Sequence, residues 1–131
     1  MIQHTCISRT LFWASLLLGT GVLLGAIGAH LLSHLISPPH LETYKTGVQY
    51  QLIHGLGIFM IGVLECVEHP LPPHKLKWAR NLMLIGVGLF SVNCYLYALT
   101  SSKIFVVLVP FGGISFIIAW IYLALSFCKK N

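Results

Sequence analysis

The chain has 131 residues, of which 56% are hydrophobic and only 8% are charged, and its formal net charge is +5. A water-soluble domain carries about 25% charged residues, so this composition excludes a soluble globular protein. The basic residues lie almost entirely between or beyond the apolar runs. That distribution is typical of membrane-flanking charge and excludes a nucleic-acid-binding surface, which needs a continuous basic stripe.

Four long uncharged runs fill most of the chain. With a rise of ~1.5 Å per residue, each can cross a hydrocarbon layer of ~30 Å as an α-helix. The sequence therefore predicts an all-α, polytopic membrane protein, in which residues 1–131 form a single domain with four transmembrane helices. The predicted spans are residues 10–34, 41–66, 78–100 and 104–127.

The first run follows Arg9 and has small residues at 25–29, a pattern that also resembles a secretory signal with its cleavage site. We favour a spanning helix, because the apolar run continues past this point to Ile36. Gly21, Gly25 and Ala29 are spaced by four residues. This spacing predicts a close approach to another helix of the bundle, where small side chains let two backbones meet.

The second span is expected to begin at Ser37-Pro38, with serine as the cap and proline in the first turn. Its opening turns are unusually polar, and the polar residues recur at intervals of three and four, so they share one arc. Such groups normally face the interior of a membrane bundle. We therefore expect one buried hydrogen-bonded cluster, a candidate binding site formed by His30, Glu42, Gln49, Tyr50 and His54. Gln51 points away from this arc, so a second helix or the interface must receive its side chain.

Trp78 and Arg80 mark the predicted start of the third helix, as an aromatic residue and a cation at headgroup level. In the last run, Pro110 either kinks the helix or is its first residue. We favour a helix that starts at Pro110, with residues 101–109 as an apolar loop or short interfacial segment.

The basic residues also predict the orientation, because lysine and arginine in short loops resist translocation. Six of them fall on one side of a four-span chain: Arg9, Lys75, Lys77, Arg80, Lys129 and Lys130. Only Lys45 and Lys103 fall on the other side. Both termini are therefore expected in the cytoplasm of an inner-membrane protein. Three cysteines, Cys6, Cys66 and Cys128, would then face a reducing compartment, so we expect no disulfide framework.

Three segments carry a family resemblance: Gly-Ala-Ile-Gly-Ala-His at 25–30, residues 41–55, and Pro-Phe-Gly-Gly-Ile-Ser-Phe at 110–116 together with Trp120. They resemble the YgdD-like family of small membrane proteins, a domain-of-unknown-function family. The resemblance covers nearly the whole chain. It implies a four-helix inner-membrane protein whose biochemical role is unassigned.

Catalysis is not expected, because no serine belongs to a nucleophile motif and no phosphate-binding loop is present in the sequence. His30 and His34, spaced i and i+4, could instead present two imidazoles for a metal or haem. No carboxylate or thiolate at matching spacing completes such a site, so we expect no metal and no cofactor.

The favoured hypothesis is a non-enzymatic structural or interaction protein of the bacterial inner membrane, with the lipid bilayer as its partner. The alternative is an oligomeric conduit or binder for a small solute, lined by Glu42, Gln49, Tyr50 and His54. This alternative requires a homo-oligomer, because four helices from one chain rarely enclose a pore.

Overall fold

The structure is a computed structural model, and it describes residues 8–128. The chain forms α1 (Arg9–His30), a short 3-10 turn η1 (Leu32–His34), α2 (Pro38–Leu64), α3 (Pro73–Leu89), α4 (Ser91–Thr100) and α5 (Ile104–Phe127). Because α4 continues the path of α3, the described part contains four helical spans that are long and apolar enough to cross a membrane. The predicted all-α fold with four transmembrane helices is confirmed.

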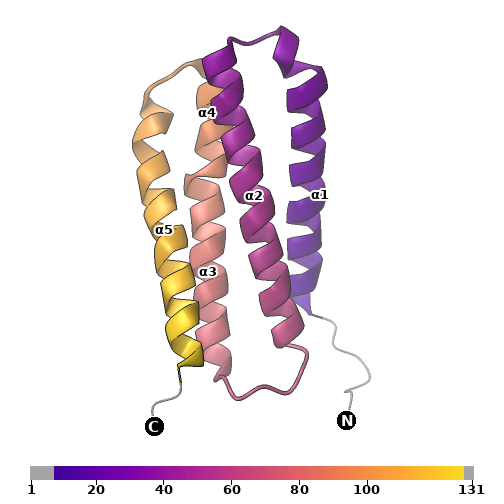
Figure 1. The fold of residues 1–131 in the computed structure, drawn as a ribbon, viewed down its shortest axis with the longest axis vertical. Helices are drawn as coiled ribbons and strands as arrows, with labels where there is room; N and C mark the ends of the chain where they lie inside the picture. Colours follow the sequence, from indigo (N-terminus) through magenta and orange to yellow (C-terminus); the bar gives the residue numbers. More distant parts are fainter. Residues whose placement is uncertain (1–7, 129–131) are drawn as a thin grey trace.

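The helices are not arranged as a closed square. On one side α2 packs against α1, and on the other it packs against α3 and α4, which in turn pack against α5 (Figure 1). The outer helices are therefore α1 and α5. The end of the bundle at which α1 begins and α5 ends also carries the α2–α3 connection, and we call it the basic end because it holds Arg9, Lys75, Lys77 and Arg80.

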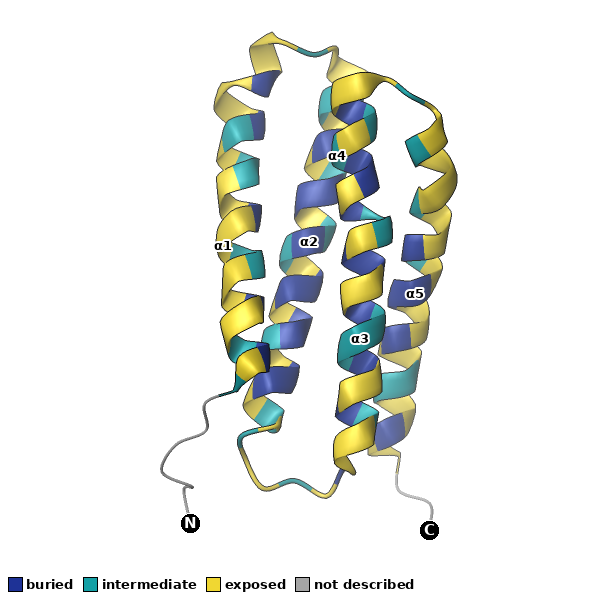
Figure 2. Cartoon of the chain, turned by 180° about the vertical axis from the view of Figure 1, so that it is seen from behind, coloured by how far each residue is buried: buried dark blue, intermediate teal, exposed yellow. Residues whose placement is uncertain are grey.

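Large apolar side chains lie both inside the bundle and on its outer surface, as expected for a protein in a lipid bilayer. The large side chains Ile58, Ile61, Leu76 and Met83 are fully buried between the helices. Many other large apolar side chains point outward along all four spans, and Figure 2 shows the exposed residues on the outer faces of the helices. In water this surface would drive aggregation, whereas hydrocarbon solvates it without penalty.

Glycines bring α1 against α2. A Cβ atom at Gly28 would lie 2.7 Å from the ring of Tyr44, and one at Gly25 would lie 3.3 Å from Val48. Gly21 is equally close to α2, but Ala29 is exposed. The prediction was thus right for Gly21 and Gly25 and wrong for Ala29. Seven residues make about two turns of a helix, so Gly28, not Ala29, lies on the face of Gly21 and Gly25.

A serine precedes the first residue of two helices. Ser8 caps α1, since its Oγ accepts a hydrogen bond from the backbone N–H of Leu11 at 3.3 Å. Ser37 is the N-cap residue of α2 and Pro38 is the first helical residue, as predicted. The Ser37 hydroxyl bonds to Nδ1 of His40 at 2.6 Å, and it does not cap a backbone N–H.

Two other helix starts differ from the prediction. The third span begins at Pro73, five residues before Trp78, because a proline is well suited to the first turn. The last span begins at Ile104, with Pro110 inside α5, so the predicted start at Pro110 is wrong. An irregular segment at residues 101–109 would leave backbone groups without partners in hydrocarbon, whereas a helix bonds most of them internally and tolerates one proline.

Candidate functional site

The expected cluster of five polar residues does not form. His54 is buried and Tyr50 is partly buried, and these two lie together between α2 and α5. His30, Glu42 and Gln49 are exposed instead. Glu42 pairs with Lys45 on its own helix at 2.9 Å. The interval of three and four residues was read correctly as one arc, but most of that arc faces away from the core.

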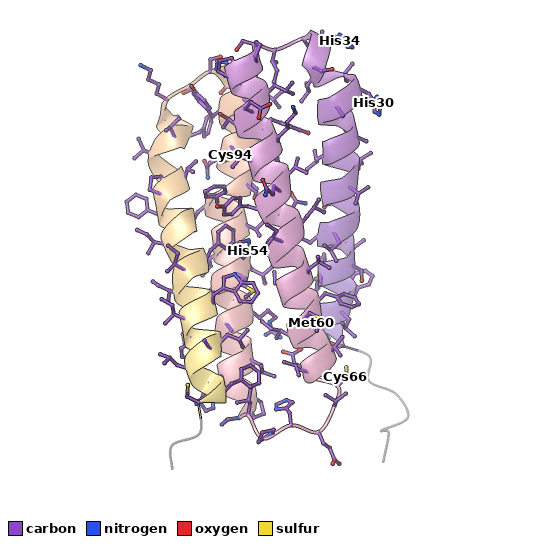
Figure 3. The ribbon with its side chains drawn as sticks, in the orientation of Figure 1. His30, His34, His54, Met60, Cys66 and Cys94 are labelled. Atoms are coloured by element: carbon purple, nitrogen blue, oxygen red, sulfur yellow. The ribbon has the colours of Figure 1, made fainter. Side chains whose placement is uncertain are left out.

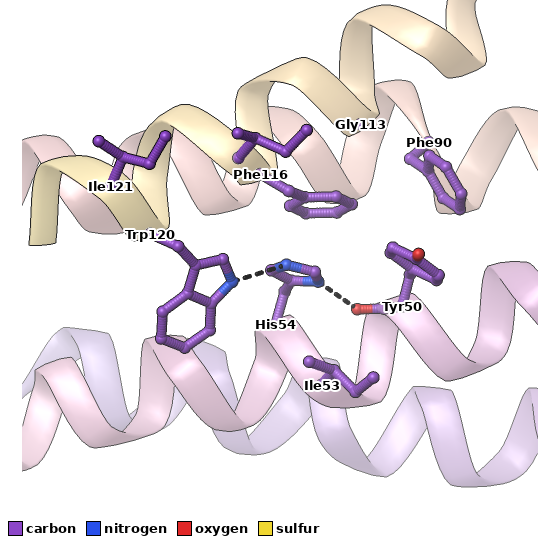
Figure 4. Close-up of a pocket in the computed structure, with 9 residues that line it drawn as sticks. Tyr50, Ile53, His54, Phe90, Gly113, Phe116, Trp120 and Ile121 are labelled. Carbon is purple, nitrogen blue, oxygen red and sulfur yellow. Dashed lines mark hydrogen bonds between the residues drawn. The ribbon is translucent and has the colours of Figure 1, made fainter. Parts of the chain in front are cut away.

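His54 is the polar centre of the remaining site. Its Nδ1 lies 2.8 Å from the backbone oxygen of Tyr50, and its Nε2 lies 3.1 Å from the indole Nε1 of Trp120 on α5 (Figure 4). Since an indole N–H only donates, Nε2 must accept and Nδ1 must carry the proton. Both nitrogens of a neutral imidazole are therefore used within the chain. This leaves no lone pair for a metal or haem at His54.

Aromatic rings enclose His54. The Phe116 ring stacks on the imidazole with centroids 3.4 Å apart. Tyr50 stacks on Phe90 at 4.4 Å, and Phe90 lies 5.8 Å from Phe116. The rings come from α2, from α5 and from the break between α3 and α4, so this wall joins three spans. Aromatic pairs at these distances stabilise a core beyond the effect of their buried area.

These side chains line a groove of about 490 Å³ between α2 and α5. We call it the aromatic groove, and its lining residues are Tyr50, Ile53, His54, Phe90, Gly113, Phe116, Ile117, Trp120 and Ile121. Its rim is open to the surroundings of the bundle: Ile53 is 45% exposed, Ile117 60% and Ile121 55%. The lining is almost entirely apolar, so the groove suits hydrocarbon and not a polar solute.

Glycines set the position of α5 behind the groove. A Cβ atom at Gly86 would lie 2.4 Å from the Phe116 ring, and one at Gly112 would lie 2.5 Å from the backbone nitrogen of Phe90. Both positions therefore require glycine. Ser115 adds a hydrogen bond from its Oγ to the backbone oxygen of Leu82 at 2.7 Å, which ties α5 to α3.

The third span is interrupted at Phe90, where α3 ends and α4 begins. The side-chain amide of Asn93 donates to the backbone oxygens of Gly88 at 3.3 Å and of Leu89 at 2.9 Å. These bonds satisfy carbonyl groups at the break, which in hydrocarbon would otherwise be costly to leave unpaired. The break brings Phe90 to the groove.

Gln51 forms a second polar centre, which the sequence analysis did not include in the site. Its Nε2 donates to the backbone oxygen of Leu17 at 2.9 Å and to Oγ1 of Thr20 at 3.1 Å, both on α1. On the other side, the hydroxyl of Tyr95 donates to its Oε1 at 2.7 Å. The expectation that another helix receives Gln51 is confirmed, and in fact two helices do.

Charged residues at the basic end form a third polar centre, also not predicted. Nη1 of Arg80 on α3 donates to Oε1 of Glu65 at 2.6 Å and to Oγ1 of Thr10 at 2.7 Å. Three spans meet in this contact. Both charged side chains are about one quarter exposed, so water and salt weaken the ion pair. We therefore expect it to hold the Arg80 side chain in position more than to stabilise the fold.

The histidine pair on the first span does not form a metal site. α1 ends at His30, and His34 lies in η1, so the two imidazoles are no longer one turn apart on a single helix. Both side chains are exposed at the end of the bundle opposite Cys66 (Figure 3). Within residues 8–128, no group of three or more histidine, cysteine, aspartate or glutamate side chains is arranged to hold a metal ion.

The cysteines differ from the expectation in one respect. Cys66 is disulfide-bonded in the structure, although the sequence predicted reduced cysteines on this side. Cys94 is a buried free thiol and Cys128 an exposed one. Cys6 lies outside the described residues.

Comparison with known proteins places these features in a family context. Residues 24–113 match the family model described as protein of unknown function (DUF423). The chain is 36% identical over 105 residues to a UPF0382 membrane protein of Staphylococcus haemolyticus, which covers 80% of this chain and 83% of the relative. It is also 36% identical over 106 residues to the UPF0382 membrane protein YwdK of Bacillus subtilis, with 81% and 85% covered.

A UPF0382 membrane protein of Haemophilus influenzae is 36% identical over 113 residues, which cover 84% of this chain and 86% of the relative. No solved structure matches the chain. The comparisons agree with the resemblance to a family of small membrane proteins of unknown function, under the name UPF0382 and not under the name YgdD-like.

Proposed function

Because the chain belongs to the DUF423 family of membrane proteins of unknown function, we propose that it is a non-enzymatic interaction protein of the bacterial inner membrane, and that its aromatic groove accommodates the hydrocarbon chain of a lipid. The observation that carries the proposal is the groove itself. It is about 490 Å³ in volume, is open along its rim and is lined almost wholly by apolar side chains.

A catalytic role is not supported by the polar group in this groove. General bases act by holding a hydrogen bond to the group that they deprotonate. His54 instead bonds to a backbone oxygen and to the indole of Trp120. A ring covered by Phe116 on one face and engaged at both nitrogens fixes α5 against α2 and has no free position for a substrate.

The orientation belongs to the same proposal. We place the basic end in the cytoplasm, with both termini, because four of the six basic residues in the described part lie there: Arg9, Lys75, Lys77 and Arg80. Only Lys45 and Lys103 lie at the opposite end. Positive residues in short loops remain on the cytoplasmic side.

An oligomeric conduit has less support than a lipid-binding groove. The exposed face of α2 is polar at Glu42, Lys45 and Gln49 but continues as Ile53, Leu56 and Met60. The polar stripe therefore ends partway along the span, and no continuous hydrophilic path follows it. A homo-oligomer stays a prediction, for which Gln49 is the natural contact, since its exposed amide can both donate and accept across a two-fold axis.

The groove can be tested by filling it. A Cβ atom at Gly113 would meet only the Phe90 ring, at 3.9 Å, so a larger side chain can enter the groove without displacing a backbone. Gly113→Phe should therefore fold and should lose bound lipid. Gly19→Phe is the matched control, because Gly19 is exposed on α1 with nothing within 4 Å.

Native mass spectrometry in mild detergent provides the readout. We expect the wild-type protein and Gly19→Phe each to retain one more lipid molecule than Gly113→Phe does. The headgroup of that lipid does not matter for the test. Equal lipid retention by all three proteins would contradict the proposal. The oligomeric state is read from the same spectra, and Gln49→Leu should reduce any dimer.

A further inference from the structure

A second pocket lies at the basic end, on the other side of the bundle from the aromatic groove. It is lined by residues of α1, α2 and α3, shares no lining residue with the aromatic groove, and has a volume of about 460 Å³. We call it the interfacial pocket. Its lining combines two arginines, an amide, a hydroxyl, an indole and two aliphatic side chains: Arg9, Arg80, Asn81, Thr10, Trp13, Ile58 and Leu84.

Several hydrogen-bond donors in this pocket have no partner among the described residues. Arg9 is exposed and makes no ion pair or hydrogen bond with another described residue. Arg80 uses only Nη1 for Glu65 and Thr10, and a guanidinium has five N–H donors in total, so those on Nε and Nη2 remain available. Asn81 is half-buried and its amide bonds to no other described residue.

The charge of the pocket is positive. Glu65 balances Arg80 at 2.6 Å, and Arg9 then leaves one uncompensated positive charge in a pocket that Arg80 and Asn81 also line. The Glu65 contact also fixes the Arg80 guanidinium in place. An anion would therefore meet a cation that is already positioned, which lowers the entropic cost of binding.

The apolar residues of the pocket lie deeper in the span than the arginines. Leu84 follows Arg80 by one helical turn, about 6 Å further toward the middle of the membrane, and Ile58 of α2 is fully buried behind it. Trp13 is 62% exposed and follows Arg9 by one helical turn, so its indole lies at the boundary between headgroups and acyl chains. Polar donors at the interface and apolar side chains below them match the two parts of a phospholipid.

We propose that the interfacial pocket binds one anionic phospholipid of the leaflet at the basic end. Its phosphate is bound by Arg9 and by the free donors of Arg80, and its acyl chain lies along Leu84 and Trp13. Basic pockets between transmembrane helices are a recognised way to bind anionic headgroups, and arginine binds phosphate in a bidentate manner. A free phosphate ion would use the arginines but would gain nothing from the apolar side chains.

Two variants test the pocket without breaking the ion pair. Arg9→Gln removes the uncompensated charge, and Asn81→Leu removes the free amide at similar size. Lys77→Gln is the matched control, because Lys77 is an exposed cation at the same end that does not line this pocket. Each purified protein is titrated in mild detergent with dioleoyl phosphatidylglycerol or dioleoyl phosphatidylcholine, and the bound lipid is counted by native mass spectrometry.

We expect the wild-type protein and Lys77→Gln to bind phosphatidylglycerol more tightly than phosphatidylcholine. Arg9→Gln should weaken phosphatidylglycerol binding about fivefold, the effect of one basic residue near a membrane surface. Asn81→Leu should weaken it by a smaller factor. Equal affinity for the two lipids, or an equal loss in Lys77→Gln, would overturn the proposal in favour of diffuse attraction.

Inorganic phosphate separates the remaining source of the same chemistry. If millimolar phosphate displaces phosphatidylglycerol from the wild-type protein, the pocket is an ion site and the lipid proposal is wrong. The outcome is independent of the aromatic groove, because Gly113→Phe should leave the preference for phosphatidylglycerol unchanged.

Discussion

The indole N–H of Trp120 on α5 donates to Nε2 of His54 on α2 across 3.1 Å, and this hydrogen bond links an outer helix to a central helix. Both side chains line the aromatic groove (Figure 4). It also explains why a histidine is found in a hydrocarbon environment. A neutral imidazole with a donor and an acceptor on either side carries no unsatisfied polar atom.

Trp120→Phe should lower the free energy of unfolding by about 0.6 to 1.7 kcal/mol, the average and the maximum measured for side-chain hydrogen bonds between membrane helices. An aromatic side chain is retained, but the N–H donor to His54 is lost together with part of the indole packing, which the control below measures at an exposed site. Thermal unfolding in detergent provides the measurement. Trp78→Phe is the control, because Trp78 is exposed on α3 and makes no hydrogen bond to a described residue. Equal stability of the two variants would show that the His54 contact contributes nothing.

Gln51→Leu and Gln49→Leu form a matched pair two residues apart on α2. Gln51 bonds to Leu17, Thr20 and Tyr95, whereas Gln49 is exposed. We expect Gln51→Leu to reduce the unfolding free energy by about 1 to 3 kcal/mol, since it also leaves the Tyr95 hydroxyl without its acceptor. Gln49→Leu should be neutral or slightly stabilising for the monomer. Chemical denaturation of both purified variants tests this, and the opposite ranking would contradict the structure.

Gly28→Leu should destabilise the protein by about 1 to 3 kcal/mol or more through overpacking. The reason is the Tyr44 ring, which lies 2.7 Å from the position of a Cβ atom at Gly28. Gly25→Leu should have a smaller effect, because the nearest atom of Val48 is 3.3 Å away and can shift. Gly19→Leu, on the exposed face of α1, should leave the melting temperature unchanged. A smaller effect for Gly28→Leu than for Gly25→Leu would mean that α1 is rotated relative to α2.

The predicted orientation can be tested with an impermeant thiol reagent on intact cells. Cys128, exposed at the end of α5, should be labelled only after the membrane is permeabilised. Lys103→Cys, at the opposite end, should be labelled without permeabilisation. Both measurements use a chain in which Cys6, Cys66 and Cys94 are replaced by serine, and the Lys103→Cys chain also carries Cys128→Ser, so that each signal has one source. Labelling of Cys128 in intact cells would reverse the orientation.

The four spans were predictable from the sequence because their length and apolar composition leave a chain few other options in lipid. The boundaries were less predictable. Pro73 and Pro110 have opposite outcomes, one at the start of a helix and one inside a helix. A proline restricts only its own turn, and which outcome occurs depends on whether the residues before it lie in water or in hydrocarbon.

The polar cluster shows a second limit. The sequence correctly predicted that Gln49 and His54 lie in the second span. The spacing of the polar residues did not predict which side of α2 faces the other helices. The glycines of the same helix were the usable signal. All four glycines of α2, Gly47, Gly55, Gly57 and Gly62, are buried, as Gln51 and His54 are, and they mark the sides of α2 on which other helices pack. The partners of these residues, above all Trp120, come from distant parts of the chain and cannot be read from spacing within one helix.

The central claim is that the aromatic groove holds a hydrocarbon chain, and photocrosslinking tests it most directly. A phosphatidylcholine with a diazirine on its acyl chain carries no net charge and so does not favour the basic end. After irradiation of the protein in bilayers of this lipid, mass spectrometry maps the labelled residues. We predict stronger labelling at the groove rim, Ile53, Ile117 and Ile121, than at Val22 and Ile85, which are also about half or more exposed but do not line the groove. Gly113→Phe should abolish that excess and Gly19→Phe should retain it, whereas uniform labelling of all exposed positions in the wild-type protein would contradict the claim.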